Sequence, residues 1–355
     1  MKNFFSEFGF TLNIGVAFLL LLSYLAPFVP PDIFWPLSFF GLAFPYLVLV
    51  NILFLVIWVI QRSKKLLLPL IVLILGFYNF TNTFQFFPRF ETSNSGIKIL
   101  SYNVHGFKYD LRTHPTKNPK VLEYFKSTGA EIICLQEAVM PKKGPFSSQG
   151  IKDVLPEINH FQLASTSSYG GSITFSKYPI INMGEIRFPG SSNLVLFSDI
   201  QISNKKIIRV YNCHLQSYSI DPDDYSIIDS LGTGSNSKQI KEARKISYKL
   251  KIGFKIRAIQ SRKIADHISK SPYPVIVCGD FNDTPVSYAY RQVRGDLKDA
   301  FVEAGWGISN SYNGELPSFR IDYILFDKKF VAGNYQRDRV PFSDHFPVRC
   351  QLKTD

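Results

Sequence analysis

The first 90 residues carry almost no charge, and this constrains the fold more than any other feature of the chain. They contain seven charged residues and 17 of the 32 phenylalanines. Between residues 8 and 61 the only charge is Asp32, and residues 66–88 have none. A wholly soluble protein is excluded, because water solvates so apolar a surface poorly. The sequence therefore predicts a membrane anchor in residues 1–90.

Three apolar stretches in this region are long enough for membrane-spanning helices, which need about 20 residues. They cover approximately residues 8–29, 37–60 and 66–87, separated by a Pro-Pro-Asp loop and by the basic segment 61–65. A cleaved signal peptide is the alternative for the first stretch. That stretch is too long, however, lacks a small-x-small cleavage site, and precedes two further spans. We expect about three transmembrane helices.

The basic residues of the short loops predict the orientation, because such residues remain cytoplasmic. Arg62, Lys64 and Lys65 lie between the second and third spans. With three spans, everything after residue 87 lies on the opposite side of the membrane. The sequence predicts a multi-pass membrane protein with an extracytoplasmic C-terminal domain, on the periplasmic side of the inner membrane if the protein is bacterial.

Residues 97–355 follow a linker at 91–96 and have the composition of a globular domain that carries about ten of the net +12 charges. Strands interleaved with helices at 118–127 and 257–269 indicate an α/β sandwich of two sheets. The four cysteines lie in apolar runs and are expected to be buried free thiols rather than disulfides. The expected strands are 97–104, 131–136, 171–176, 193–202, 207–215, 274–280, 321–326 and 346–352.

Residues 218–256 have the composition of an insertion, acidic and polar at first and then strongly basic. Residues 238–257 contain eight Lys or Arg and one Glu, interleaved with apolar side chains. The segment could be the solvated face of a long helix, a track for nucleic acid, or an element at a membrane surface. The interleaved apolar residues favour the membrane surface over the nucleic-acid track.

Polar residues follow the apolar strands at five places, where a sandwich can bring them to one mouth. Each place alone has a structural explanation, but polar groups at several buried strand ends all need partners or water. The five segments are SYNVHG (101–106), CLQEA (134–138), YNCHLQS (211–217), GDFNDTP (279–285) and SDHFP (343–347), with RIDYIL (320–325) beside the last.

In this order the segments resemble the endonuclease/exonuclease/phosphatase superfamily. Its members are metal-dependent phosphohydrolases related to abasic-site endonucleases, deoxyribonuclease I, neutral sphingomyelinases and inositol polyphosphate 5-phosphatases. The resemblance covers residues 97–354, and GDFN, a later SDH and an upstream LQE carry it. It implies a four-layer α/β/β/α sandwich with the active site at one end of the two sheets.

The resemblance also implies a site for Mg²⁺ or Mn²⁺, which prefer oxygen ligands. Glu137 is the main candidate ligand, with Asn103 beside it and Asp344 as a further one. His105 follows the Asn103 segment and is a candidate neighbour of the site.

Five further residues have catalytic roles by the same resemblance. Asp280 would orient and deprotonate the attacking water, and Asn282 would hold the phosphate or that water. His214 would bind the phosphate and stabilise the transition state. His345 would donate to a nonbridging phosphate oxygen, and Asp322 would fix its tautomer and favour its charged form.

We therefore expect a membrane-anchored, divalent-metal-dependent phosphodiesterase or phosphatase that uses an activated water. The substrate would be a nucleic acid or a phospholipid headgroup, reached from the lipid bilayer, and the sequence identifies no protein partner. The alternative is a catalytically idle membrane receptor that binds phosphorylated ligands with the same fold. The complete set of catalytic residue types argues against the receptor.

Overall fold

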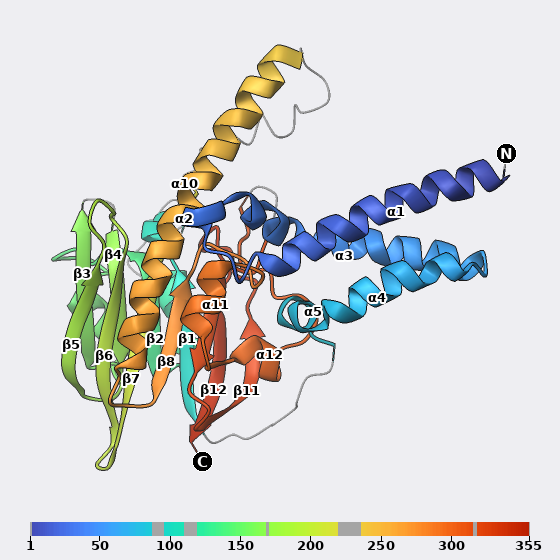
Figure 1. The fold of residues 1–355 in the computed structure, drawn as a ribbon. Coiled ribbons are helices and arrows are strands. Elements are labelled where there is room, and N and C mark those ends of the chain that lie inside the picture. The colour runs from blue at the N-terminus through green and yellow to red at the C-terminus, as the bar shows by residue number, and fades with distance from the viewer. Residues whose placement is uncertain are drawn as a thin grey trace.

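The computed structural model describes residues 2–86, 96–109, 119–167, 170–218, 236–314 and 318–354. Within these ranges, a pair of six-stranded sheets packs face to face (Figure 1). The first sheet contains β1 (Ile97–Asn103), β2 (Ile132–Ala138), β3 (His160–Ser167), β4 (Gly170–Ser176), β11 (Phe330–Arg337) and β12 (Val348–Thr354). The second contains β5 (Ile180–Arg187), β6 (Leu194–Ser203), β7 (Lys206–His214), β8 (Val275–Asp280), β9 (Lys298–Asp299) and β10 (Asp322–Phe326). The strand orders are β11-β12-β1-β2-β4-β3 and β5-β6-β7-β8-β10-β9.

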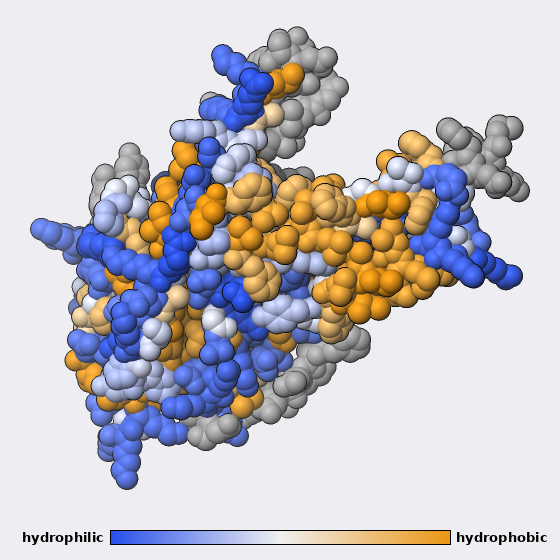
Figure 2. Space-filling view, viewed as in Figure 1, coloured by the Kyte–Doolittle hydropathy of each residue, from blue (hydrophilic) through white to orange (hydrophobic). Residues whose placement is uncertain are grey.

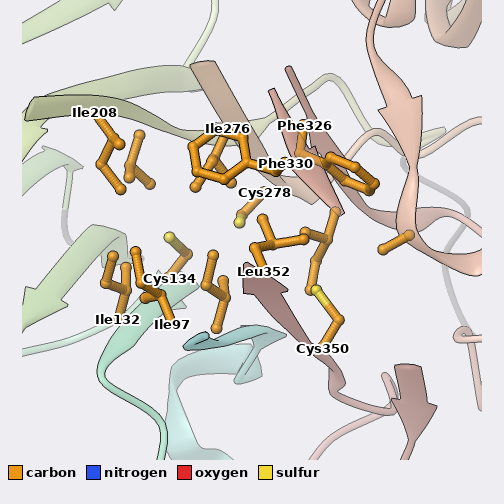
Figure 3. Packing of buried hydrophobic residues seen from close by; sticks show 14 of the residues in the cluster. Ile97, Ile132, Cys134, Ile208, Ile276, Cys278, Phe326, Phe330, Cys350 and Leu352 are labelled. Atoms are coloured by element: carbon orange, nitrogen blue, oxygen red, sulfur yellow. The ribbon is translucent and has the colours of Figure 1, made fainter. Parts of the chain in front are cut away.

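The main core lies between the two sheets. Figure 3 shows Ile132 and Cys134 of β2 on one side of it and Ile276 and Cys278 of β8 on the other. These central strands are continuous apolar runs because both of their faces are covered. All four cysteines are buried free thiols, as the sequence predicts.

Helices cover the outer face of each sheet. Two of them, α7 (Lys120–Thr128) and α8 (Ser148–Val154), pack on the first sheet, and α10 (Asn236–Ser269) and α11 (Tyr288–Arg294) pack on the second. The short α12 (Ala300–Ala304) lies beside β11. Proline precedes α7 and a left-handed glycine, Gly129, ends it, as expected from the sequence. The four-layer α/β/β/α sandwich is confirmed.

Helix α10 is longer than the helix predicted at 257–269, and it includes the basic segment, as in the long-helix alternative. The predicted helix 257–269 and the basic segment before it form one continuous 34-residue helix. Most of the expected insertion is thus the N-terminal part of a helix that projects beyond the sandwich and whose C-terminal part packs on it (Figure 1). Residues 219–235, which include the acidic portion of the insertion, lie outside the described residues.

The anchor region contains two helices long and apolar enough to cross a membrane. These spans are Ser6–Leu25 within α1 (Lys2–Leu25), and α3 (Pro36–Ile60). The short α2 (Pro31–Phe34) joins them, and η1 (Lys64–Leu66), α4 (Leu67–Leu75) and α5 (Phe77–Thr83) follow. The third expected span is bent by 63° between α4 and α5, so the described residues contain two candidate spans, or three if the bent pair is one.

The anchor packs directly on the sandwich at the segment that follows β8. Gly41 of α3 lies so close to Val286 that a Cβ atom there would be 2.3 Å from the Val286 carbonyl oxygen. Only glycine permits this approach. On α2, Asp32 binds Arg262 of α10 at 2.7 Å, and Arg320 donates to the carbonyl of Asn82 at 2.7 Å.

Candidate active site

The ends of five strands bring most of the predicted site residues together. Parallel β1 and β2 end near Asn103 and Glu137, and parallel β7 and β8 end at His214 and Asp280, which are partners in register. Antiparallel β10 begins at Asp322, directly opposite Asp280. Strand direction alone therefore places five of the eight residues at one end of the sandwich.

Loops at the same end supply the other three residues. Asn282 follows β8, and Asp344 and His345 precede β12. The Asn282 backbone N–H donates to Asp280 Oδ1 at 2.8 Å, and its side-chain amide donates to Asp280 Oδ2 at 3.1 Å. Asn282 has a φ of 53°, and His105 and Glu137 also have positive φ values, so strained backbone is concentrated here.

Asp280, Asp322 and His345 form a buried cluster. Their ligand atoms lie within 4.8 Å of one another. His345 Nδ1 is 2.9 Å from Asp322 Oδ2, and His345 Nε2 is 3.8 Å from Asp280 Oδ2. Asp322 therefore orients the imidazole so that its second nitrogen faces the mouth on the Asp280 side.

Burial and neighbouring charges raise the pKa of the Asp280 carboxyl, and neighbouring charges raise the pKa of the His345 imidazole. Burial raises the pKa of Asp280 to about 7, although nearby His345 pulls it down. Burial would lower the pKa of His345, but the carboxylates of Asp322 and Asp280 outweigh it and raise that pKa to about 10. A carboxyl that titrates near neutrality and a protonated imidazole are suited to general base and acid roles.

A second, more exposed group lies beside the first and consists of Glu137, Asp344, His105 and His214. His105 Nδ1 is 3.5 Å from Glu137 Oε2 and 3.4 Å from Asp344 Oδ1. His214 Nε2 is 3.5 Å from Glu137 Oε1 and has no hydrogen-bond partner among the described residues. Burial disfavours ionised Glu137, but His214 and the Asn103 amide hold the pKa of its carboxyl below the ordinary value.

The donor set of this second group fits a hard divalent cation. The carboxylates of Glu137 and Asp344 face the same imidazole and are partly open to solvent, and such oxygens suit Mg²⁺ or Mn²⁺. Asn103 connects the two groups, because its amide nitrogen donates to Glu137 Oε1 at 3.2 Å and to Asp280 Oδ2 at 3.1 Å. The side-chain Oδ1 of Asn103 accepts a hydrogen bond from the backbone N–H of His105 at 3.1 Å.

Two buried amides below the mouth join the sheets, and sequence reasoning did not single them out. Gln136 donates to Asn212 Oδ1 at 2.7 Å, and Asn212 donates to the carbonyls of Leu135 and Ile173 at 3.1 and 2.9 Å. In the sequence, each of them is an amide residue within an otherwise apolar strand.

The sequence predicts His105 only as a neighbour of the site. The structure places it between the carboxylates of Glu137 and Asp344.

A family comparison agrees with this geometry. Residues 100–345, well over half of the chain, match the model described as the endonuclease/exonuclease/phosphatase family. The chain belongs to that family. Residues 2–83 match a second model, described as a domain of unknown function (DUF8431). A search of curated proteins gives no match.

Solved structures from this endonuclease/exonuclease/phosphatase family are similar to the chain at low identity. One from Beutenbergia cavernae is 15% identical, with a TM-score of 0.50 over 73% of this chain and 71% of that chain. A mannosyl-6-phosphatase from Bacteroides thetaiotaomicron is 15% identical, with a TM-score of 0.47 over 72% and 99%. Sphingomyelinase C from Streptomyces griseocarneus is also 15% identical, with a TM-score of 0.43 over 73% and 99%. At such identities the likeness describes the fold and not the substrate.

Proposed function

We propose that the protein is a membrane-anchored, divalent-metal-dependent phosphodiesterase or phosphatase. Members of its family are hydrolases that act on phosphoester bonds. The observation that carries the proposal is the buried Asp280–His345–Asp322 cluster beside the oxygen donors Glu137 and Asp344. A general base, an acid and a cation site at one mouth are what attack by water on a phosphoester requires.

The chain's own groups divide the reaction between them. Asp280 removes a proton from the attacking water, and Asn282 holds the Asp280 carboxylate and the phosphate. His345, held by Asp322, donates to a nonbridging phosphate oxygen. His214 directs its unpartnered Nε2 at the same phosphate. These groups act on the phosphate without a covalent enzyme intermediate.

Glu137 and Asp344, with Asn103 beside them, would hold Mg²⁺ or Mn²⁺. When bound, the ion polarises the phosphoryl oxygen and stabilises the leaving oxygen. The substrate is a nucleic acid or a phospholipid headgroup. A panel of DNA, RNA, phospholipids and inositol phosphates offered to the purified full chain distinguishes these classes.

The test of the reaction uses full-length protein in lipid nanodiscs with a soluble aryl phosphodiester. We expect turnover that a chelator stops and Mg²⁺ or Mn²⁺ restores. Asp280→Asn and Glu137→Ala abolish it, and His345→Ala lowers it about 10²-fold. Glu157→Ala, at an exposed carboxylate distant from the mouth, is the matched control. Wild-type rates in Asp280→Asn would exclude this mechanism, and ligand binding without turnover would favour the receptor.

We also propose that residues 1–90 form a multi-pass anchor and that the catalytic domain, residues 97–355, is extracytoplasmic. The Arg62–Lys65 loop lies at the end of the α1–α3 hairpin away from the sandwich, where Lys65 binds Glu7 at 2.7 Å. The basic loop thus lies beside the first turns of α1, on the side of the membrane that loop charges predict to be cytoplasmic.

A further inference from the structure

One side of α10 contacts α2 and the residue after it, which join the two candidate membrane helices α1 and α3. Arg262 donates to both oxygens of Asp32 at 3.0 and 2.7 Å. About three turns towards the N-terminus, the Lys251 ammonium lies 5.2 Å from the ring centre of Trp35. These contacts identify which side of α10 faces the anchor.

The same side of α10 continues past the sandwich as an exposed, mixed face. Residues at helical spacing from Arg262 and Lys251 are Tyr248, Arg244 and Lys241. Tyr248 is 62% exposed, and Arg244 and Lys241 are also exposed. Figure 2 shows hydrophilic atoms along this projecting helix, with hydrophobic ones among them, beside the apolar surface of the anchor.

Exposed apolar side chains also lie where the other end of the anchor enters the sandwich. Trp306 is 71% exposed and Ile308 is 51% exposed. Between them, Gly307 exchanges backbone hydrogen bonds of 2.9 and 2.6 Å with Gln85, just beyond α5. A large exposed tryptophan beside a membrane-spanning region is typical of a residue at the lipid–water interface.

We propose that these residues form a seating surface for the bilayer that holds the anchor. The seating surface comprises Lys241, Arg244, Tyr248, Trp306 and Ile308, and its partner is an anionic phospholipid headgroup layer. Basic side chains interleaved with aromatic and aliphatic ones match such a layer in charge and polarity. The inference rests on the membrane anchoring proposed above and adds a second, electrostatic contact to it.

Contact between α10 and the bilayer also determines the direction in which the mouth of the active site faces. Arg257 of α10 is fully buried, and it donates to Asp283 at 2.9 Å and to the Gln216 carbonyl at 2.7 Å. Asp283 lies in the loop that follows Asp280, the last residue of β8, and that also contains Asn282. Because the helix and the loop are joined in this way, an orientation imposed on α10 is passed to the catalytic groups.

The test measures the environment of a fluorophore on the full chain in phosphatidylcholine vesicles, with or without a third phosphatidylglycerol. An environment-sensitive dye is attached at Tyr248→Cys and, as the matched control, at Lys205→Cys in the exposed β6–β7 turn at the opposite end. The four native cysteines are buried and leave the introduced thiol as the reactive one. We expect the dye at 248 to shift to the blue and resist aqueous iodide when phosphatidylglycerol is present, and the dye at 205 to change in neither respect.

A charge variant tests the electrostatic contribution. Lys241→Gln with Arg244→Gln should remove the phosphatidylglycerol dependence of the dye at 248, as should high salt. Lys205→Gln with Lys329→Gln, which removes two exposed charges elsewhere, should leave it intact. All these variants keep wild-type turnover of the soluble phosphodiester.

Equal exposure of the dye at 248 in both vesicles overturns the seating surface. So does shielding by a short DNA duplex at physiological salt in the absence of phosphatidylglycerol. If the dye is shielded as expected but the wild-type chain hydrolyses no phosphodiester, the seating surface stands and the proposed reaction fails.

Discussion

Gly41→Ala should reduce catalysis although Gly41 lies in α3, one of the two described helices long and apolar enough to cross a membrane. The new Cβ atom would lie 2.3 Å from the Val286 carbonyl oxygen and 2.8 Å from the Ala26 Cβ, whereas real Cβ contacts are not shorter than 3.0 Å. Helix α3 and the loop after β8 must therefore move apart by several tenths of an ångström. That loop carries Asp280 and Asn282 only a few residues earlier.

Two opposing contributions determine the change in stability. Overpacking costs roughly 1–3 kcal/mol, and replacing a helical glycine by alanine returns up to about 1 kcal/mol. We expect a small net loss of stability. A displacement approaching 1 Å at the catalytic loop can cost up to about 10²-fold in rate, so kcat should fall between about tenfold and that limit.

The assay is kcat for the soluble phosphodiester, together with Tm, on the full chain in nanodiscs. Gly15→Ala is the matched control, because it makes the same change in α1 where no heavy atom lies within 4 Å of the new Cβ. It should keep wild-type kcat and melt no earlier. If Gly41→Ala also keeps wild-type kcat and Tm, the contact between anchor and catalytic loop has no catalytic consequence.

Three further results are expected. The pH profile of kcat/KM should be bell-shaped. Asp280 acts deprotonated, so activity is lost as pH falls through about 7, and His345 acts protonated, so activity is lost as pH rises through about 10. A flat profile across this range would contradict both roles. Arg320→Met should lower the stability by roughly 3 kcal/mol, since it leaves Asp299 as a buried carboxylate without its cation; urea unfolding measures this, and an unchanged midpoint would show that the pair is dispensable. Alkaline phosphatase fused after residue 90 should be active in a bacterial host and inactive when fused after residue 65; the reverse pattern would place the catalytic domain in the cytoplasm.

The sequence predicts the central strands well and the edge strands poorly. Strands β1, β2 and β8 are buried on both faces and are visible as continuous apolar runs. Strand β5 lies at an edge, most of its side chains are exposed or half-buried, and its sequence IINMGEIR has no such run. Strand β11 contains an irregularity between Gly333 and Gln336 that interrupts the alternation. The edge strands are fixed by pairing with their neighbours, which local sequence does not record.

The site could be predicted in composition but not in detail. Strand ends bring five of the eight predicted residues to one mouth and loops at the same end supply the other three, while their individual roles stay predictions. The bridging amide of Asn103 depends on side-chain directions in three strands from both sheets, and the position of His105 depends on the turn that follows β1. The packing of Gly41 on Val286 brings together residues 245 positions apart, and no local sequence pattern predicts it.

The direct packing of α3 on the catalytic loop has a consequence for kinetics. If residues 1–90 span a bilayer as proposed, a reaction centre packed so closely on them stays at the membrane surface, and it would search for a lipid-borne substrate in two dimensions. Its rate then follows the fraction of lipids that are substrate, not their bulk concentration. Inert lipid slows such an enzyme by dilution alone, at a constant total amount of substrate.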